Sequence, residues 1–80
     1  MNYIALFFTH SGAVKFDKTL RNKGIKTLMM PSPRVLSSNC GISVQFTYDS
    51  DIQPFINEDV ESIYKIQDAG TKNYMLVYSD

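Results

Sequence analysis

Cysteine and histidine are scarce in this chain, which has one of each among its 80 residues. A single cysteine excludes an internal disulfide, and one cysteine with one histidine cannot supply the four protein ligands of a structural zinc site. A domain this small buries only about 60–65% of the surface that its unfolded chain exposes. We therefore expect its stability to come from a well-packed core, a partner, or both, without a metal or a cofactor.

An excess of one charge and long apolar runs are also missing. Eight basic and eight acidic residues give a formal net charge of zero, and no basic cluster marks a nucleic-acid binder. No apolar stretch approaches the roughly 20 residues needed to cross a bilayer. The opening segment Met1–Ile4 lacks the charged start of a secretory signal. We expect no nucleic-acid partner and no membrane segment, and a free thiol fits the reducing cytoplasm.

The first third of the chain predicts a strand followed by a helix. Tyr3–Phe8 is a short apolar run bounded by polar residues, which is typical of a strand buried on both faces. Ser11 is the expected N-cap of the helix, because its hydroxyl can accept from the free amides of the first turn. Gly24 fits the left-handed position that ends helices. The apolar stripe of the helix is Ala13, Phe16 and Leu20.

Two further strands are predicted on either side of a polar stretch. The first covers Ile25–Met30 and is ended by Pro31 and Pro33, because proline cannot donate a hydrogen bond to a neighbouring strand. The second has the strictest alternation in the chain and so one buried and one wet face. Its apolar positions are Ile42, Val44, Phe46 and Tyr48, and its polar positions are Ser43, Gln45 and Thr47.

The second half predicts a short helix and two strands. The apolar positions of the helix are Ile52, Phe55 and Ile56, and Pro54 is tolerated because it falls in the first turn. Val60–Ile66 reads as a strand, and Asp68–Asn73 has the composition of a loop. Tyr74–Tyr78 then predicts a final strand that forms a hairpin with the preceding one.

The predicted order is β-α-β-β-α-β with an extra C-terminal strand. The expected fold is a single ferredoxin-like α+β domain over residues 1–80, an antiparallel sheet with two helices on one face. The first helix then makes a right-handed crossover, and the first and third strands become neighbours. Residues 9–12 and 34–41 are therefore expected at the same rim of the sheet.

Cys40 is the candidate reactive group. A thiol reacts as its thiolate, which nearby cations and helix N-termini favour. Arg34 offers an anion-binding guanidinium, His10 can hold or accept a proton, and the start of the first helix carries partial positive charge. The residues expected to stabilise a thiolate or another anion around Cys40 are Arg34, Ser37, Ser38, Gly41, His10 and Ser11.

Each of these residues also has an ordinary structural role. Free cysteine often packs as a small hydrophobe. Arg34 can cap carbonyls or pair with a surface carboxylate, and serines commonly satisfy the amides of a turn. The residue types alone leave a working thiol and a packing thiol equally open.

The run Pro33-Arg34, Ser37-Ser38 and Cys40-Gly41, followed by an alternating strand, resembles the selenium/sulfur carrier-like family of small bacterial proteins. The resemblance extends over the opening strand, the Thr9-His10-Ser11 junction and the first helix. It implies that Cys40 is the carrier thiol, with Arg34, both serines and Gly41 in the family's positions. The interruption at Pro54 and the strand over residues 72–80 depart from the family's pattern.

Three hypotheses follow for function. In the first, the chain is a cytoplasmic carrier that takes sulfur or selenium on Cys40, as a persulfide or selenosulfide, from a donor protein and passes it to an acceptor. In the second, it is a non-catalytic ferredoxin-like binding module that forms a homodimer and uses Cys40 only for packing. The third, a small thiol enzyme using Cys40 with His10, has the weakest basis, because no acidic residue is evidently placed to orient His10.

Overall fold

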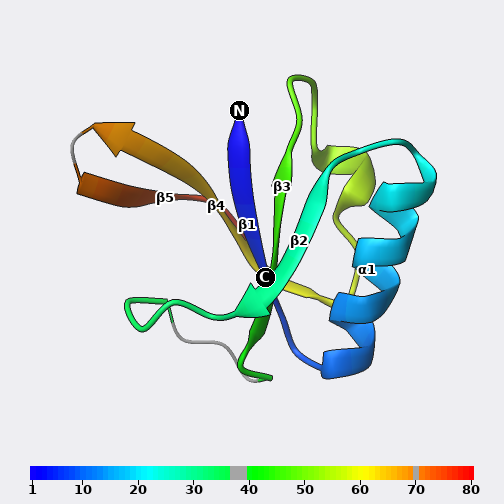
Figure 1. The fold of residues 1–80 in the computed structure, drawn as a ribbon. Helices are drawn as coiled ribbons and strands as arrows, with labels where there is room; N and C mark the ends of the chain where they lie inside the picture. The colour runs from blue at the N-terminus through cyan, green and yellow to red at the C-terminus, as the bar shows by residue number, and fades with distance from the viewer. Residues whose placement is uncertain (37–39, 70) are drawn as a thin grey trace.

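A five-stranded antiparallel sheet with the strand order β2-β3-β1-β4-β5 forms the centre of the protein (Figure 1). The computed structural model describes residues 1–36, 40–69 and 71–80. The strands are β1 (Asn2–Phe7), β2 (Thr27–Pro31), β3 (Ile42–Thr47), β4 (Val60–Ala69) and β5 (Thr71–Ser79). One α-helix, α1 (His10–Asn22), and one 3-10 turn, η1 (Gln53–Phe55), complete the described elements.

β1 is the central strand, and its side chains are buried on both faces, as predicted. Its neighbours are β3 on one side and β4 on the other, both antiparallel to it. Tyr3, Ala5 and Phe7 pack with α1, whereas Ile4 and Leu6 belong to a smaller cluster on the opposite face. The core under α1 consists of Tyr3, Ala5, Phe7, Ala13, Phe16, Leu20, Val44, Phe46, Phe55, Val60 and Ile63.

The two ends of α1 are fixed by different residues. Thr9, not Ser11, is the N-cap: its backbone is extended and its Oγ1 accepts from the Gly12 amide at 3.1 Å. The helix therefore begins at His10, and Ser11 lies exposed in the first turn. At the other end Gly24 has a φ of 80°, which confirms its predicted left-handed position, and its amide donates to the Arg21 carbonyl at 3.0 Å.

The prediction of two helices on one face is wrong. Residues 53–55 form a single 3-10 turn, in which the Ile56 amide donates to the Gln53 carbonyl at 3.1 Å. Ile56 is extended, and Asn57 starts another turn by accepting from the Asp59 amide through its side chain. Because Ile56 is extended and Asn57 favours this side-chain bond, the segment does not continue as a helix.

The strand limits also differ from the prediction. β2 begins at Thr27 and includes Pro31, which is tolerated because β2 is an edge strand. The predicted loop over Asp68–Asn73 is wrong, because residues 68–69 and 71–73 continue β4 and β5 and only position 70, outside the described residues, separates them. β5 carries a register irregularity opposite Ile63 and Tyr64, where Val77 is the extra residue.

Asp17 joins α1 to the edge strand β2. This carboxylate is buried on the helix face that covers the sheet, and it accepts from Thr27 Oγ1 at 2.6 Å and from Arg21 Nε at 2.9 Å. Both hydrogen bonds have good length, and a buried acceptor that loses its partners is costly. Asp17 therefore helps to hold the β1–α1–β2 crossover together.

We predict that Asp17→Ala lowers the free energy of unfolding by about 1–3 kcal/mol, because it leaves Thr27 without its buried partner. Urea denaturation followed by circular dichroism measures this loss. Glu58→Ala is the matched control, since Glu58 is an exposed carboxylate and its removal should change stability by less than about 0.5 kcal/mol. Equal losses in the two variants would contradict a structural role for Asp17.

Candidate functional site

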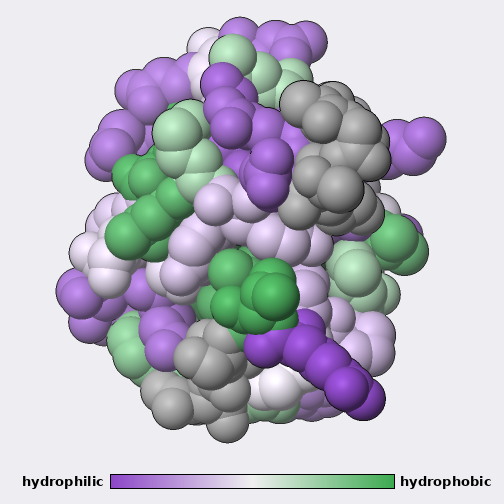
Figure 2. Space-filling model, turned by 90° about the vertical axis from the view of Figure 1, so that its left-hand side faces the viewer, coloured by the Kyte–Doolittle hydropathy of each residue, from purple (hydrophilic) through white to green (hydrophobic). Residues whose placement is uncertain are grey.

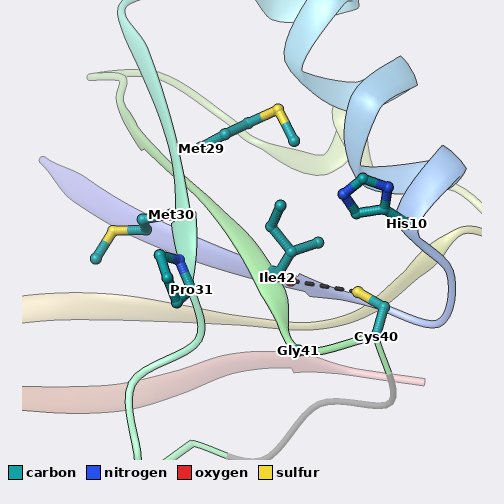
Figure 3. A pocket seen from close by; sticks show the side chains of 7 residues that line it. All are labelled: His10, Met29, Met30, Pro31, Cys40, Gly41 and Ile42. Atoms are coloured by element: carbon teal, nitrogen blue, oxygen red, sulfur yellow. Dashed lines mark hydrogen bonds between the residues drawn. The ribbon is translucent and has the colours of Figure 1, made fainter.

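The start of α1 and the start of β3 meet at one edge of the sheet, the lower edge in Figure 1. An open pocket of about 380 Å³ lies between them. Its lining combines residues from β2, β3 and the first turn of α1, and the side chains are drawn in Figure 3. The lining residues are His10, Met29, Met30, Pro31, Cys40, Gly41 and Ile42. The predicted juxtaposition of His10 with Cys40 is therefore found.

The Cys40 thiol is half-buried in this pocket. Its Sγ–H donates to the Ile42 carbonyl at 3.4 Å, drawn as a dashed line in Figure 3. The residue also packs against the core under α1. The residue is therefore neither fully buried in the core nor fully exposed to solvent.

His10 approaches the pocket from the helix. It is the first residue of α1 and is exposed, and Figure 3 shows its imidazole on the helix side of the pocket, across from the thiol. The amide end of α1 adds partial positive charge on the same side. The imidazole and the helix N-terminus therefore lie on the side of the pocket that faces an anion formed on Cys40.

The rest of the lining is apolar. Figure 3 shows that Met29 and Met30 point to opposite sides of β2, with the thioether of Met29 on the side of the helix. Ile42 and Pro31 complete the wall, and no Asp, Glu, Lys or Arg among the residues that the structure describes lines the pocket. Among the described residues, no group of three His, Cys, Asp or Glu side chains is placed to hold a metal ion. The pocket suits a small, polarisable and weakly hydrated ligand better than a strongly charged one.

Gly41 is held in a conformation that favours glycine. Its φ is 72°, in the left-handed region, and its carbonyl accepts from the Ser32 amide at 3.0 Å. This bond closes the base of the connection between β2 and β3. Gly41 thus places Cys40 at the pocket through backbone geometry.

The other predicted site residues are not all brought together. Arg34 is exposed and does not line the pocket, and its neighbour Leu36 packs on the face of the sheet opposite α1. Ser11 is exposed on α1, with its Oγ 3.4 Å from Thr9 Oγ1, and does not line the pocket either. Ser37 and Ser38 lie outside the described residues.

Sequence reasoning missed the apolar part of the lining. The sequence predicts Met29 and Ile42 only as strand residues and Pro31 only as the end of a strand. The alternation of the third strand nevertheless places Ile42 on the same face as Val44 and Phe46. Met29 pairs with Val44 across the sheet and so shares that face. The missing information was the register between β2 and β3, which no local pattern specifies.

The fold and the pocket define a small α+β domain with one partly accessible thiol at the rim of an antiparallel sheet. A family model described as "Putative Se/S carrier protein-like" matches residues 2–66, and the chain belongs to this family. The match includes Cys40, His10 and all strands except β5 and the end of β4. No curated protein and no solved structure matches the chain. Within the described ranges, no helix has the length and apolar character needed to cross a membrane.

We predict that His10→Gln slows alkylation of Cys40 by iodoacetamide at neutral pH about threefold or more, because an imidazole at the same pocket can accept the proton that the thiol loses when it reacts. Loss of free thiol with time measures the rate. Arg34→Gln is the matched control, since Arg34 is exposed and outside the pocket, and it should react like the unsubstituted protein. If Arg34→Gln were alkylated more slowly than His10→Gln, Arg34 and not His10 would be the residue that assists the thiol.

Proposed function

We propose that the protein is a carrier of sulfur or selenium that holds the atom on Cys40 and passes it from a donor protein to an acceptor protein. The observation that carries this proposal is the placement of the chain's one cysteine at a pocket on the sheet rim, half-buried and next to His10. Family membership supports the same conclusion. An open pocket at an edge fits a carrier, which needs an accessible thiol and a docking surface rather than an enclosed substrate cavity.

The proposed loading step is an exchange between sulfur atoms. The Cys40 thiolate attacks the outer sulfur of a persulfide on the donor, a new S–S bond forms, and the donor cysteine leaves as a thiolate. One bond forms and one breaks, so the pair of proteins undergoes no net oxidation or reduction. A selenosulfide on the donor reacts in the same way and leaves selenium on Cys40. Unloading repeats the exchange with an acceptor thiol.

The pocket supplies surroundings that suit the loaded state. The outer chalcogen is polarisable and lies among the thioether of Met29 and the aliphatic side chain of Ile42. The imidazole of His10 and the amides at the start of α1 are the groups that would stabilise its negative charge. Of the residues predicted to stabilise an anion on Cys40, His10 and Gly41 line the pocket, whereas Arg34 and Ser11 do not. Arg34, being exposed, is then available to a docked donor or acceptor instead.

The donor and acceptor are proteins with reactive thiols, and the proposed setting is the reducing cytoplasm, where a free thiol persists. The proposal assigns no cofactor, nucleic acid or membrane to the reaction. The donor and acceptor proteins would undergo the net chemical change, because the carrier ends each cycle with the same free thiol with which it began.

We predict that incubation with a cysteine desulfurase and cysteine adds the mass of one sulfur atom to Cys40 in most molecules. Intact-mass spectrometry, followed by peptide mapping of the segment around Cys40, measures this. The added mass should disappear on treatment with a thiol reductant, since an S–S bond is reducible.

Cys40→Ser is the control for this experiment and should gain no mass. A protein that gains no sulfur although iodoacetamide labels Cys40 readily would contradict the carrier proposal. His10→Gln should gain sulfur more slowly than Arg34→Gln. Because His10 lines the pocket and Arg34 does not, this difference would show that the pocket takes part in the loading step.

We infer a second candidate function, a non-catalytic binding module that self-associates, from the exposed apolar side chains of β5. Met75, Leu76 and Val77 follow one another on this edge strand, and each is exposed. Figure 2 views the side of the protein away from α1 and shows apolar residues reaching the surface there in separate patches. An exposed edge strand with apolar side chains can pair with a second copy. In this reading Cys40 only packs against the core.

For this candidate we predict a dimer that Leu76→Lys weakens about tenfold or more, because each copy would bring a lysine into the interface. Sedimentation velocity over a range of protein concentrations measures the dissociation constant. Leu28→Lys is the matched control: Leu28 is 57% exposed and Leu76 is 52% exposed, and they lie on opposite edge strands. Cys40→Ser should dimerise normally. A chain that stays monomeric at all concentrations would eliminate this candidate.

A further inference from the structure

The charges of this chain are divided between its two halves, although the formal net charge is zero. Five of the eight basic residues lie between positions 15 and 26, and seven of the eight acidic residues come at or after position 49. The basic residues form no continuous run, because they are spaced two or three positions apart. Their arrangement in the folded chain therefore decides whether they act together.

The helix α1 gathers three of these cations on its solvent side. Lys15, Lys18 and Arg21 are each three residues apart, which makes them neighbours along the helix surface, and all three are exposed. We call these three residues the basic face. The one acidic residue of α1, Asp17, is buried and accepts hydrogen bonds from Thr27 and Arg21. The outer side of α1 therefore carries positive charge.

The three cations differ in the carboxylates that lie near them. Lys15 Nζ is 3.5 Å from Asp59 Oδ2, and its side chain remains 71% exposed. Arg21 Nε is 2.9 Å from Asp17 Oδ2, and its side chain remains 61% exposed. Lys18 makes no ion pair with any of the residues that the structure describes. An anion from another molecule can therefore reach all three side chains.

The basic face joins the pocket through the first turns of α1. His10 lines the pocket, and Val14 and Lys18 follow it at intervals of four residues, the spacing of neighbours along a helix surface. A helix rises about 1.5 Å per residue, so the distance along α1 from His10 to Arg21 is about 16 Å. An extended segment of about five residues spans this length. A partner that lies along the basic face therefore ends at the pocket.

We propose that the basic face is the docking surface for an acidic segment of the exchange partner, a segment that lies beside the partner's reactive cysteine. The acidic side chains pair with Lys15, Lys18 and Arg21 while the partner's cysteine reaches Cys40 at the start of the helix. The inference rests on the proposed function, because it names the surface chemistry of the donor or acceptor. Complementary charge of this kind acts mainly on the rate of association.

An acidic protein segment fits this surface better than a nucleic acid or a membrane does. The basic face offers three cations, and the seven carboxylates in the second half of the chain would repel a long polyanion. The only large apolar side chain that α1 exposes along its described length is Val14. The helix therefore lacks the apolar side that a membrane-surface helix inserts into lipid.

The test uses two synthetic peptides in which a cysteine, held as a mixed disulfide with 2-thiopyridine, is followed by five glutamates or by five glutamines. The Cys40 thiolate attacks the sulfur of the peptide cysteine, a disulfide between Cys40 and the peptide forms, and thiopyridine leaves as its thiolate, which takes up a proton. The absorbance of the released thiopyridine measures the rate.

In about 0.05 M salt, the glutamate peptide should react about fivefold or more faster than the glutamine peptide, because attraction to the basic face raises its rate of encounter. In about 1 M salt the screening length falls to about 3 Å, and the two peptides should react at equal rates. Equal rates at the lower salt concentration would overturn the proposal.

Charge reversal on α1 shows where the preference arises. Lys18→Glu should slow the glutamate peptide about threefold or more and leave the glutamine peptide unchanged. Lys18→Gln removes one charge instead of reversing it, should slow the glutamate peptide about twofold, and serves if Lys18→Glu does not fold. Circular dichroism verifies the fold of each variant.

Lys65→Glu is the matched control, because it changes the net charge by the same amount at another place. Lys65 lies on β4, whereas α1 packs chiefly on β1, β2 and β3, and Figure 1 shows β4 directed away from the helix. This variant should react with the glutamate peptide at nearly the unchanged rate. Equal slowing by Lys18→Glu and Lys65→Glu would attribute the preference to overall charge and overturn the proposal.

Two other occupants of the basic face give different results. If an oligonucleotide or vesicles of anionic lipid protect Cys40 from iodoacetamide at concentrations where a cysteine-free glutamate peptide does not, the partner is not an acidic protein segment and the proposal is overturned. If Lys18→Glu weakens a dimer in sedimentation velocity, the basic face binds a second copy of the chain and the proposal is likewise overturned.

These readouts involve no sulfur donor, so they separate the docking surface from the carrier function. If the glutamate peptide is preferred but the desulfurase loads no sulfur, the carrier proposal fails and the docking surface stands. If sulfur is loaded normally while the two peptides react at equal rates, the docking surface fails and the carrier proposal stands.

Discussion

The burial of β1 on both faces is the constraint on which the rest of the structure depends. This strand places Ala5 and Phe7 under α1 and Ile4 and Leu6 on the other side of the sheet. A strand buried on both faces is central, because an edge strand leaves one of its edges without a neighbouring strand. β3 and β4 therefore flank it, and β2 and β5 are left as the edges. In a chain of 80 residues with no disulfide, this strand contributes side chains to the buried cluster on each face of the sheet.

The same constraint assembles the candidate site. Because β1 and β3 are antiparallel neighbours, the end of β1 and the start of β3 lie at the same rim. α1 starts at that rim with His10, and Cys40 comes two residues before Ile42, the first residue of β3. The thiol thus lies at the same pocket as the imidazole at the start of α1, although no local sequence motif contains both residues. A carrier needs little more than this: a reactive group that is held at an edge of the sheet and partly shielded.

The central strand, α1 with its closing Gly24, and the alternating strand could be predicted because each follows from a local pattern of burial or backbone conformation. The prediction of a second helix failed, since three apolar positions at helical spacing do not outweigh the extended Ile56 and the side chain of Asn57, which accepts from the Asp59 amide. The neighbourhood of His10 and Cys40 was predictable from strand order. The position of Arg34 was not, because proximity in sequence to Cys40 says nothing about which face of the sheet a connection turns to.

The chemistry that is available follows from the amino-acid sequence alone: one thiol, one imidazole, no disulfide, and no surplus of charge for a nucleic acid. The sequence also determined that β1 is buried on both faces, since no polar residue interrupts Tyr3–Phe8. Only the tertiary structure decided which groups surround the thiol. Pairing of β2 with β3 brings Met29 and Pro31 to the pocket, and the docking of Leu36 on β1 carries the connection to the other face. These outcomes depend on register and on packing between residues distant in sequence, which local preference does not encode.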